Sequence, residues 1–183
     1  SHGAVKESVT HIVGGQFRNL ATVGGSIFGK FGFSDVLSCF LAFDSYVELH
    51  HEGIIPLEQF AVNKYPDDIL VRRIVKKHPQ ESVYLSHRNS KTDFPVLTCA
   101  ISLGKEEAYA VVGARPSRAV KVKLSDQWNV MIKDDEGRRK IADEVTGQLN
   151  FGSNMRGSAD YRRHLSEVLI RRGLAQLEER REN

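Results

Sequence analysis

The sequence predicts an α+β protein in which helices cover one face of an antiparallel sheet. Four segments with the alternation or apolar content of strands follow one another between residues 82 and 124, and two amphipathic helices follow them. Strands and helices that occur in separate blocks are typical of this fold class. The 183 residues are 40% hydrophobic and 27% charged, as in ordinary globular domains.

The chain is predicted to begin with short helices. Apolar side chains from Val5 to Val13 recur at helical spacing, which predicts an amphipathic helix over residues 4–13. The Gly-Gly pair at 14–15 is expected to end this helix. Ser34 is the expected N-cap of a second, apolar helix.

Two strands and a boundary are predicted next. Alternating apolar residues indicate a strand over 46–50, and the apolar segment 69–75 indicates another. Residues 56–60 between them are expected to form a short loop or helical turn. Residues 76–81 are polar and include a proline, so we expect the boundary between two modules there.

The second half of the chain is predicted to form a sheet followed by helices. The expected elements are strands over 82–87, 96–101, 108–112 and 119–124, a helix over 135–149, and a last helix capped by Ser158. In the fourth strand Val120 is expected to face inward. In the last helix Tyr161 is expected on the buried face.

Two features of the sequence leave alternatives open. Phe31 and Phe33 are predicted either to fill the core or to border a ligand. The arginine pairs of the last helix, at 162–163, 171–172 and 180–181, form either a solvated or salt-bridged face or a docking surface for an acidic partner. Nucleic acid is not an expected partner, because no aromatic platform or zinc motif accompanies these charges.

Composition excludes several other classes of protein. No apolar run approaches the roughly 18 residues that a membrane span needs, and the net charge of +3 is too small to indicate nucleic acid. Cys39 and Cys99 lie in apolar surroundings, so we expect two buried thiols in a reducing, cytoplasmic compartment. Two cysteines cannot hold an iron–sulfur cluster. The seven histidines show no metal-binding spacing, so no metal site is expected.

Residues 17–27 form the segment with the strongest indication of ligand binding. Gly24 and Gly25 are expected to adopt positive φ angles in a turn, where consecutive N–H groups suit phosphate oxygens. Thr22 and Ser26 add hydroxyl groups. The alternative is an ordinary turn, because neither the Rossmann nor the Walker glycine pattern is present.

Two motifs carry a resemblance to a known family. Residues 21–27 read A-T-V-G-G-S-I, with Ser34-Asp35 following at a fixed distance, and residues 156–165 read R-G-S-A-D-Y-R-R-H-L. Both resemble motifs of the FAD-binding, or flavoprotein, subunit of the molybdenum hydroxylases, which include xanthine dehydrogenase and the aerobic carbon monoxide dehydrogenase flavoprotein. Because the two motifs occur in the family's order, the resemblance extends over nearly the whole chain.

The resemblance implies a domain organisation and a function. Residues 3–78 would form the second FAD-binding subdomain of the molybdopterin dehydrogenase type. Residues 82–183 would form the C-terminal α+β domain of the flavoprotein subunit. The chain would be part of an oxidoreductase and would carry electrons from iron–sulfur clusters through FAD to an acceptor, with NAD as one candidate.

Partners follow from the same resemblance. The molybdenum cofactor and the 2Fe-2S clusters are expected on partner subunits, namely a molybdenum-binding large subunit and an iron–sulfur small subunit. No membrane or nucleic acid partner is expected. The alternative function is a non-catalytic docking or scaffold module of such a complex, with no cofactor of its own.

The resemblance also implies which residues contact FAD. They are Ile12, Thr22, Val23, Gly24, Gly25, Ser26, Ser34, Asp35 and Leu70. The segment 22–26 matches the family's contact with the FAD diphosphate, and Asp35 matches a carboxylate that contacts the hydroxylated chain of the flavin. Core packing is the alternative for Ile12 and Leu70. No residue of the chain is expected to be catalytic, because the flavin itself carries the chemistry.

Four departures from the family pattern qualify these expectations. Leu85 falls near where some members place a basic residue beside the flavin, which weakens the expectation of NAD use. Ser26 replaces the usual asparagine, and residues 29–33 replace a run of small residues and Ser-Pro. The family's N-terminal glycine-rich loop, typically G-G-T-D, has no counterpart in the sequence. We therefore expect a fragment of a longer flavoprotein subunit that holds about half of the FAD site and is inactive alone.

Overall fold

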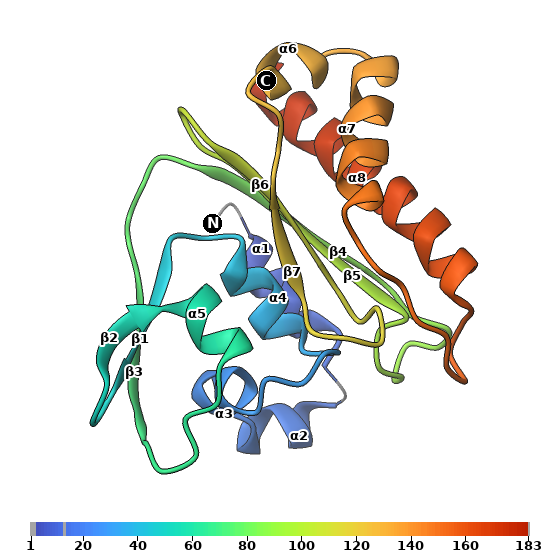
Figure 1. The fold of residues 1–183 in the computed structure, drawn as a ribbon. Coiled ribbons are helices and arrows are strands. Elements are labelled where there is room, and N and C mark those ends of the chain that lie inside the picture. Colours follow the sequence, from blue (N-terminus) through green and yellow to red (C-terminus); the bar gives the residue numbers. More distant parts are fainter. Residues whose placement is uncertain (1–2, 13, 183) are drawn as a thin grey trace.

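The computed structural model describes residues 3–12 and 14–182, so the expectation for Val13 lies outside the described residues. The helices are α1 (Ala4–Thr10), α2 (Gly15–Leu20), α3 (Val23–Phe28), α4 (Asp35–Leu41), α5 (Leu57–Val62), α6 (Trp128–Met131), α7 (Asp135–Gly147) and α8 (Ala159–Glu182). The strands are β1 (Ser45–Leu49), β2 (Gly53–Pro56), β3 (Leu70–Val75), β4 (Glu81–His87), β5 (Leu97–Leu103), β6 (Ala108–Gly113) and β7 (Val120–Lys123). Figure 1 shows their arrangement.

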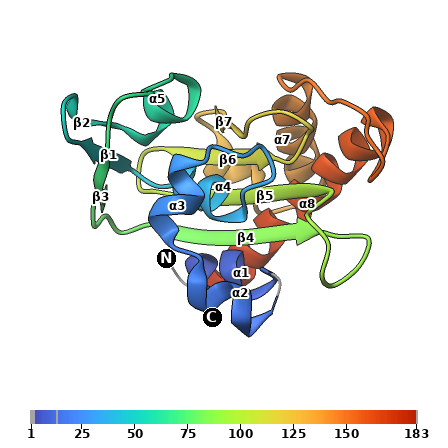
Figure 2. The same cartoon turned by 90° about the horizontal axis from the view of Figure 1, so that it is seen from below.

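A four-stranded antiparallel sheet with the order β4-β5-β6-β7 forms the centre of the molecule. Its register places Val83 opposite Ile101 and Ile101 opposite Ala110. Helices α7 and α8 cover one face, whereas α1 and α4 cover the other, as two perpendicular views show (Figures 1 and 2). The predicted α+β class and the helical layer from the C-terminal part of the chain are confirmed. The sequence did not indicate that α1 and α4 also fold back onto the second face.

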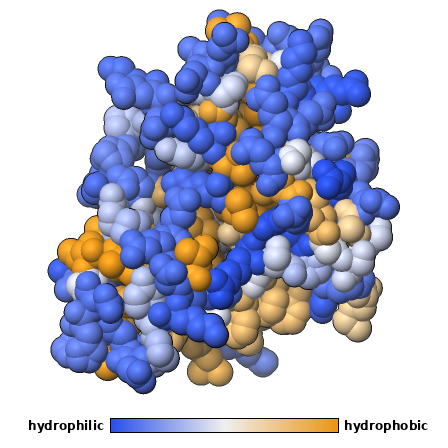
Figure 3. Space-filling view, in the orientation of Figure 1, coloured by the Kyte–Doolittle hydropathy of each residue, from blue (hydrophilic) through white to orange (hydrophobic). Residues whose placement is uncertain are grey.

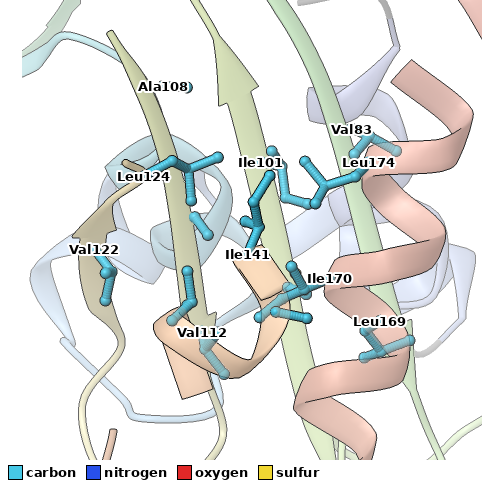
Figure 4. Packing of buried hydrophobic residues seen from close by; sticks show 14 of the residues in the cluster. Val83, Ile101, Ala108, Val112, Val122, Leu124, Ile141, Leu169, Ile170 and Leu174 are labelled. Carbon is cyan, nitrogen blue, oxygen red and sulfur yellow. The ribbon is translucent and has the colours of Figure 1, made fainter. Parts of the chain in front are cut away.

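The face toward α7 and α8 has its own hydrophobic core. Figure 4 shows Ile101 of β5 pointing toward Ile170 and Leu174 of α8, with Ile141 of α7 close by. A Cβ atom at Gly173 of α8 would lie 2.8 Å from Cδ1 of Ile101. The glycine therefore lets the long helix approach the sheet closely. The distance between α8 and the sheet depends on the fit of these side chains.

The opposite face of the sheet belongs to a second core. Tyr84, Ala100 and Val111 point away from α8 and pack among buried residues of α3, α4, α5 and β1. Every residue of α4 is buried, and the hydroxyl of Thr98 on β5 donates to the Ser38 hydroxyl on α4 over 3.1 Å. The N-terminal elements therefore pack directly against the sheet.

A small sheet with the order β2-β1-β3 lies beside this second core. Val47 and Leu49 of β1 are buried on one face, as their alternation predicted. The expected helical turn is present as α5, with Phe60 fully buried. Residues 76–80 connect β3 to β4 as an extended segment. Among the described residues no helix is long and apolar enough to cross a membrane.

Several local expectations are wrong for physical reasons. The Gly-Gly pair at 14–15 does not end a helix, because α1 stops at Thr10 and Gly15 begins α2. Val120 is 38% exposed because it lies on β7, the edge strand of the sheet. Tyr161 is 40% exposed, whereas its neighbour Arg162 takes the inward position on α8.

Candidate functional site

The segment 17–27 forms helices instead of the expected turn. Gly24 and Gly25 lie inside α3 and neither has a positive φ angle, so that expectation is wrong. Thr22 explains the difference, because its Oγ1 accepts a hydrogen bond from the Gly25 N–H over 2.9 Å and caps the helix. The first turn of α3 still presents N–H groups without intrahelical partners.

The start of α4 lies next to this turn. Ser34 is its N-cap, as predicted, and its Oγ accepts from the Leu37 N–H over 3.1 Å. The same hydroxyl donates to the Ser26 carbonyl over 3.2 Å, so it links α3 to α4. Two short helices therefore begin side by side, and their first turns border one cleft.

We name this hollow the α3–α4 cleft. It has a volume of about 590 Å³. Its lining residues are His11, Ile12, Phe17, Leu20, Ala21, Thr22, Gly25, Ser26, Phe31, Phe33, Ser34, Asp35, Val36, Arg88, Asp93 and Phe94. This size lies within the range of about 300–1,000 Å³ that is usual for sites of small molecules and cofactors.

Asp35 is the only carboxylate on the cleft wall formed by α4, and it is held by two partners from β4 and the segment after it. Nη2 of Arg88 donates to both carboxylate oxygens, over 2.7 and 2.8 Å. The hydroxyl of Tyr84 donates to Oδ1 over 2.5 Å. Burial first, and then the Asp35 carboxylate, raise the pKa of Tyr84 well above its usual value, so the phenol keeps the proton that it donates.

Part of the cleft wall is aromatic. The rings of Phe31 and Phe33 are stacked with centroids 5.2 Å apart, and the rings of Phe33 and Phe94 are tilted at 4.3 Å. All three side chains are substantially exposed. The core-filling alternative for Phe31 and Phe33 is therefore wrong, and both border the cleft.

Exposed apolar residues continue around the mouth of the cleft. Phe17 and Leu20 of α2 are both exposed, and α2 has no buried residue. Apolar residues interrupt the polar surface at the lower end of the molecule, where α2 and α3 lie (Figure 3). The cleft is thus bordered by hydrophobic side chains that are available to a ligand or to another surface.

The structure brings together six of the nine residues expected to contact a cofactor. Ile12, Thr22, Gly25, Ser26, Ser34 and Asp35 line the α3–α4 cleft. The other three do not line it. Val23 is exposed on α3, and Leu70 packs against the second core with its Cδ2 atom 3.9 Å from where a Cβ of Gly24 would lie.

These residues fit the parts of a flavin dinucleotide. The N–H groups and hydroxyls at the start of α3 suit a diphosphate, and the aromatic wall suits an apolar ring system. Asp35 already accepts three hydrogen bonds, which leaves about one of its four acceptor positions for a ligand hydroxyl. FAD would supply the capacity to accept and release electrons, while the chain would supply position and polarity.

Arg88, Tyr84 and Phe94 were not predicted as site residues. Arg88 lines the cleft and is 53 residues from Asp35 in the sequence, so no local spacing connects them. Tyr84 lies between Val83 and Leu85 in β4, so its sequence context is that of an ordinary strand residue. The only sequence signal was weak, namely an arginine directly after a predicted strand.

Part of the chain matches a family of known proteins. Residues 2–77 match the family model described as the FAD binding domain in molybdopterin dehydrogenase. A search of curated proteins returns no match. The family model thus covers the part of the chain that forms α1 to β3 and most of the α3–α4 cleft.

Solved structures resemble the whole chain. Quinoline 2-oxidoreductase from Pseudomonas putida 86 superposes with a TM-score of 0.81 and 17% identity, over 94% of this chain and 66% of that one. A carbon monoxide dehydrogenase from Hydrogenophaga pseudoflava gives 0.84 and 17%, over 97% and 67%. The enzyme from Oligotropha carboxidovorans gives 0.81 and 18%, over 96% and 67%. This chain therefore spans about two thirds of the length of these relatives.

Fold and sequence together define the class. The chain has the fold of a flavoprotein of the carbon monoxide dehydrogenase type. Residues 2–77 match the family model of the FAD binding domain in molybdopterin dehydrogenase. The resemblance that the first sequence motif indicated is thereby confirmed over residues 2–77.

Proposed function

We propose that the α3–α4 cleft binds FAD and that this chain serves as the FAD-binding part of a molybdenum-containing hydroxylase or dehydrogenase. The observation that carries the proposal is the convergence of two independent results. The FAD-binding family model covers residues 2–77, and six of the nine residues that the resemblance singled out line one cleft of suitable size.

Each wall of the cleft has a role in this proposal. The first turn of α3, with Thr22 and Ser26, faces the diphosphate of FAD. Asp35 accepts a hydrogen bond from a ligand hydroxyl, while Arg88 and Tyr84 hold the carboxylate in place. Phe31, Phe33 and Phe94 exclude water from the apolar side of the ligand.

Electron transfer and partners extend the proposal. In the complete enzyme, electrons reach FAD from 2Fe-2S clusters on a small subunit, after oxidation of a substrate at a molybdenum centre on a large subunit. The similarity to a Cu,Mo-containing carbon monoxide dehydrogenase supports this arrangement. NAD is not part of the proposal, because neither the family model nor the similar structures name it.

The cellular location is also a proposal. Both cysteines are free and buried, a state that persists most readily in a reducing compartment. We therefore propose a cytoplasmic oxidoreductase subunit. Under this proposal, the flavoprotein parts of xanthine dehydrogenase and of carbon monoxide dehydrogenase are functional analogues of this chain.

A glycine substitution tests the FAD site. In Gly25→Val, a branched side chain occupies the first turn of α3, where a Cβ would lie 3.1 Å from the Thr22 hydroxyl. We expect FAD, followed by quenching of its fluorescence, to bind the unchanged protein and to bind the variant at least about tenfold more weakly, because the diphosphate loses its close approach to backbone N–H groups.

Gly15→Val is the matched control for this measurement. Gly15 begins α2, does not line the cleft, and a Cβ there would meet no atom within 4 Å. Its FAD affinity should equal that of the unchanged protein, and thermal melts should show that both variants are folded. Equal FAD affinity in Gly25→Val and Gly15→Val would remove the cofactor from this cleft.

A further inference from the structure

A second pocket adjoins the α3–α4 cleft. We name it the arginine pocket; its volume is about 370 Å³. Its lining residues are Gly32, Phe33, Phe94, Pro95, Ala114, Pro116, Ser117, Arg118, Asn154 and Arg156. Phe33 and Phe94 line both hollows, so this aromatic pair separates them.

Positive charge accumulates around this pocket. Arg118 and Arg156 are on its wall, and the chain neighbours of its lining residues include the buried Arg115. Arg162 is also buried and donates to Oδ1 of the lining residue Asn154 over 2.5 Å. Two guanidinium groups thus line the pocket, and two buried ones adjoin its lining residues.

Only one of these four cations has a carboxylate partner among residues 3–12 and 14–182. Arg156 pairs with Asp93, with Nη2 and Oδ1 2.9 Å apart. Arg162 donates to the carbonyls of Val96, Gly152 and Gly157, and Arg115 donates to those of Asn150 and Arg118. Burial lowers the pKa of both, yet an arginine side chain stays charged at neutral pH. Four arginines and one aspartate leave an excess of three positive charges.

Several donors on the pocket wall are not used within the described part of the chain. Nη1 of Arg156, Nη2 of Arg118, the Ser117 hydroxyl and Nδ2 of Asn154 each lack a hydrogen bond there. These groups come from two separate loops, one between β6 and β7 and one between α7 and α8. Guanidinium, hydroxyl and amide donors around one volume are the usual means of recognising phosphate oxygens.

The walls of the pocket are firmly joined. The Ala114 N–H donates to the Gly32 carbonyl over 2.8 Å, and the Gly152 N–H donates to the Arg115 carbonyl over 2.6 Å. A Cβ at Gly32 would lie 2.6 Å from the Ser117 carbonyl oxygen, so only glycine permits this approach. A ligand would therefore meet a preformed site and would spend little binding energy on ordering it.

We propose that the arginine pocket binds the phosphate of a small aromatic molecule whose ring lies against Phe33 and Phe94. The excess charge and the free donors select the anion, and the exposed rings select an aromatic group. Such a phosphate has two sources: a free nucleotide, or the nucleotide half of a dinucleotide that also occupies the α3–α4 cleft. The proposal does not rest on FAD binding, because the arginine pocket is complete within the described chain.

Calorimetric titration with AMP, adenosine and inorganic pyrophosphate tests this inference. AMP carries both ring and phosphate, whereas each of the other probes lacks one of them. We expect AMP to bind at least tenfold more tightly than adenosine and to weaken as salt is raised, because the attraction is electrostatic. Arg118→Gln should weaken AMP binding about fivefold to tenfold, since it removes one charged donor from the wall.

Two variants complete the design. Arg139→Gln removes the same charge from an exposed position on α7 and should leave AMP affinity unchanged. Ala21→Phe fills the α3–α4 cleft from an exposed position and should spare AMP while weakening FAD. If Arg118→Gln also weakens FAD, the dinucleotide is the source of the phosphate; if FAD is unaffected, the source is a free nucleotide.

Three results would overturn the inference. AMP and adenosine of equal affinity would mean that no phosphate site exists. Loss of AMP binding in Ala21→Phe, with no effect of Arg118→Gln, would place the nucleotide in the α3–α4 cleft alone. No binding of AMP at millimolar concentration would mean that the arginines only stabilise the surrounding loops through hydrogen bonds to their carbonyl groups. A failure of Gly25→Val to alter FAD binding bears on the proposed function and leaves this inference intact.

Discussion

Cys39 and Cys99 are the only thiols of the chain, and both are free and buried. Burial raises the pKa of each to about 12. Because the thiolate is the reactive form, we expect less than about a tenth of the thiols to react with a colorimetric disulfide reagent in the native protein at pH 8. Both should react at once in denaturant. Rapid reaction of the native protein would show that one thiol is reached by solvent.

The same pKa values imply a loss of stability in alkali. The unfolded thiols titrate near 9.0, whereas the native thiols titrate near 12. Above pH 9 the unfolded state releases protons that the native state retains, so the free energy of unfolding falls from pH 9 to 12 and is unaffected below pH 9. Urea melts across this range should show the decline, and Cys99→Ala should reduce its slope. Identical slopes in both proteins would contradict the expectation.

Individual residues differ in how far the sequence reveals their roles. Asp35 could be predicted because it follows a capping serine within a recognisable motif. Its partners could not, since Tyr84 and Arg88 reach it across 49 and 53 residues. Arg162 belongs to a sequence pattern of paired arginines that indicates a solvated face, yet it is 1% exposed. Arginine is rarely buried, so only the loop carbonyls around it reveal its position.

Elements with strong periodicity were the most predictable. The strands from β4 to β7 alternate or are wholly apolar, and their positions agree with the predicted ranges within a few residues. Helix α2 has no buried residue, so it leaves no periodic pattern to detect. Helix α3 contains Gly24 and Gly25, which each disfavour a helix by about 1 kcal/mol, and burial of Ile27 together with the Thr22 cap outweighs this cost.

Two glycines of α7 allow a test at the level of one helix. A Cβ at Gly137 would lie 2.0 Å from the Met131 carbonyl oxygen, whereas at Gly147 it would meet nothing within 4 Å. Gly137→Ala should therefore destabilise the protein by about 1–3 kcal/mol through overpacking. Gly147→Ala should stabilise it by up to about 1 kcal/mol, since alanine favours the helix. Opposite shifts in urea midpoint are expected, and shifts of the same sign would mean that backbone crowding does not govern α7.

At the scale of the whole molecule, the central sheet is a shared layer. The sequence showed that strands precede helices, but it did not show that α4 returns to the sheet across some 60 residues. Ser102 of β5 donates to the Ala42 carbonyl over 2.5 Å, and Thr98 reaches Ser38. Such contacts between distant segments carry no periodic signal. The predicted division into residues 3–78 and 82–183 therefore remains a proposal about folding units.

Residues 82–183 expressed alone test that division. This part contains the core shared by β4 to β7 with α7 and α8, so we expect a cooperative thermal melt. It would also expose Tyr84, Ala100 and Val111, which residues 3–77 cover in the whole chain. We therefore expect a lower melting temperature, binding of a hydrophobic dye, and self-association.

Val111→Lys separates these effects, because Val111 is fully buried in the whole chain but would face solvent in the isolated part. In the whole chain the substitution buries an unpaired charge and should be strongly destabilising, by several kcal/mol. In residues 82–183 it should instead lower dye binding and self-association while the melt stays cooperative. A non-cooperative melt of the unsubstituted part would mean that both cores form one folding unit. Destabilisation of equal size in both contexts would mean that α4 does not cover this face.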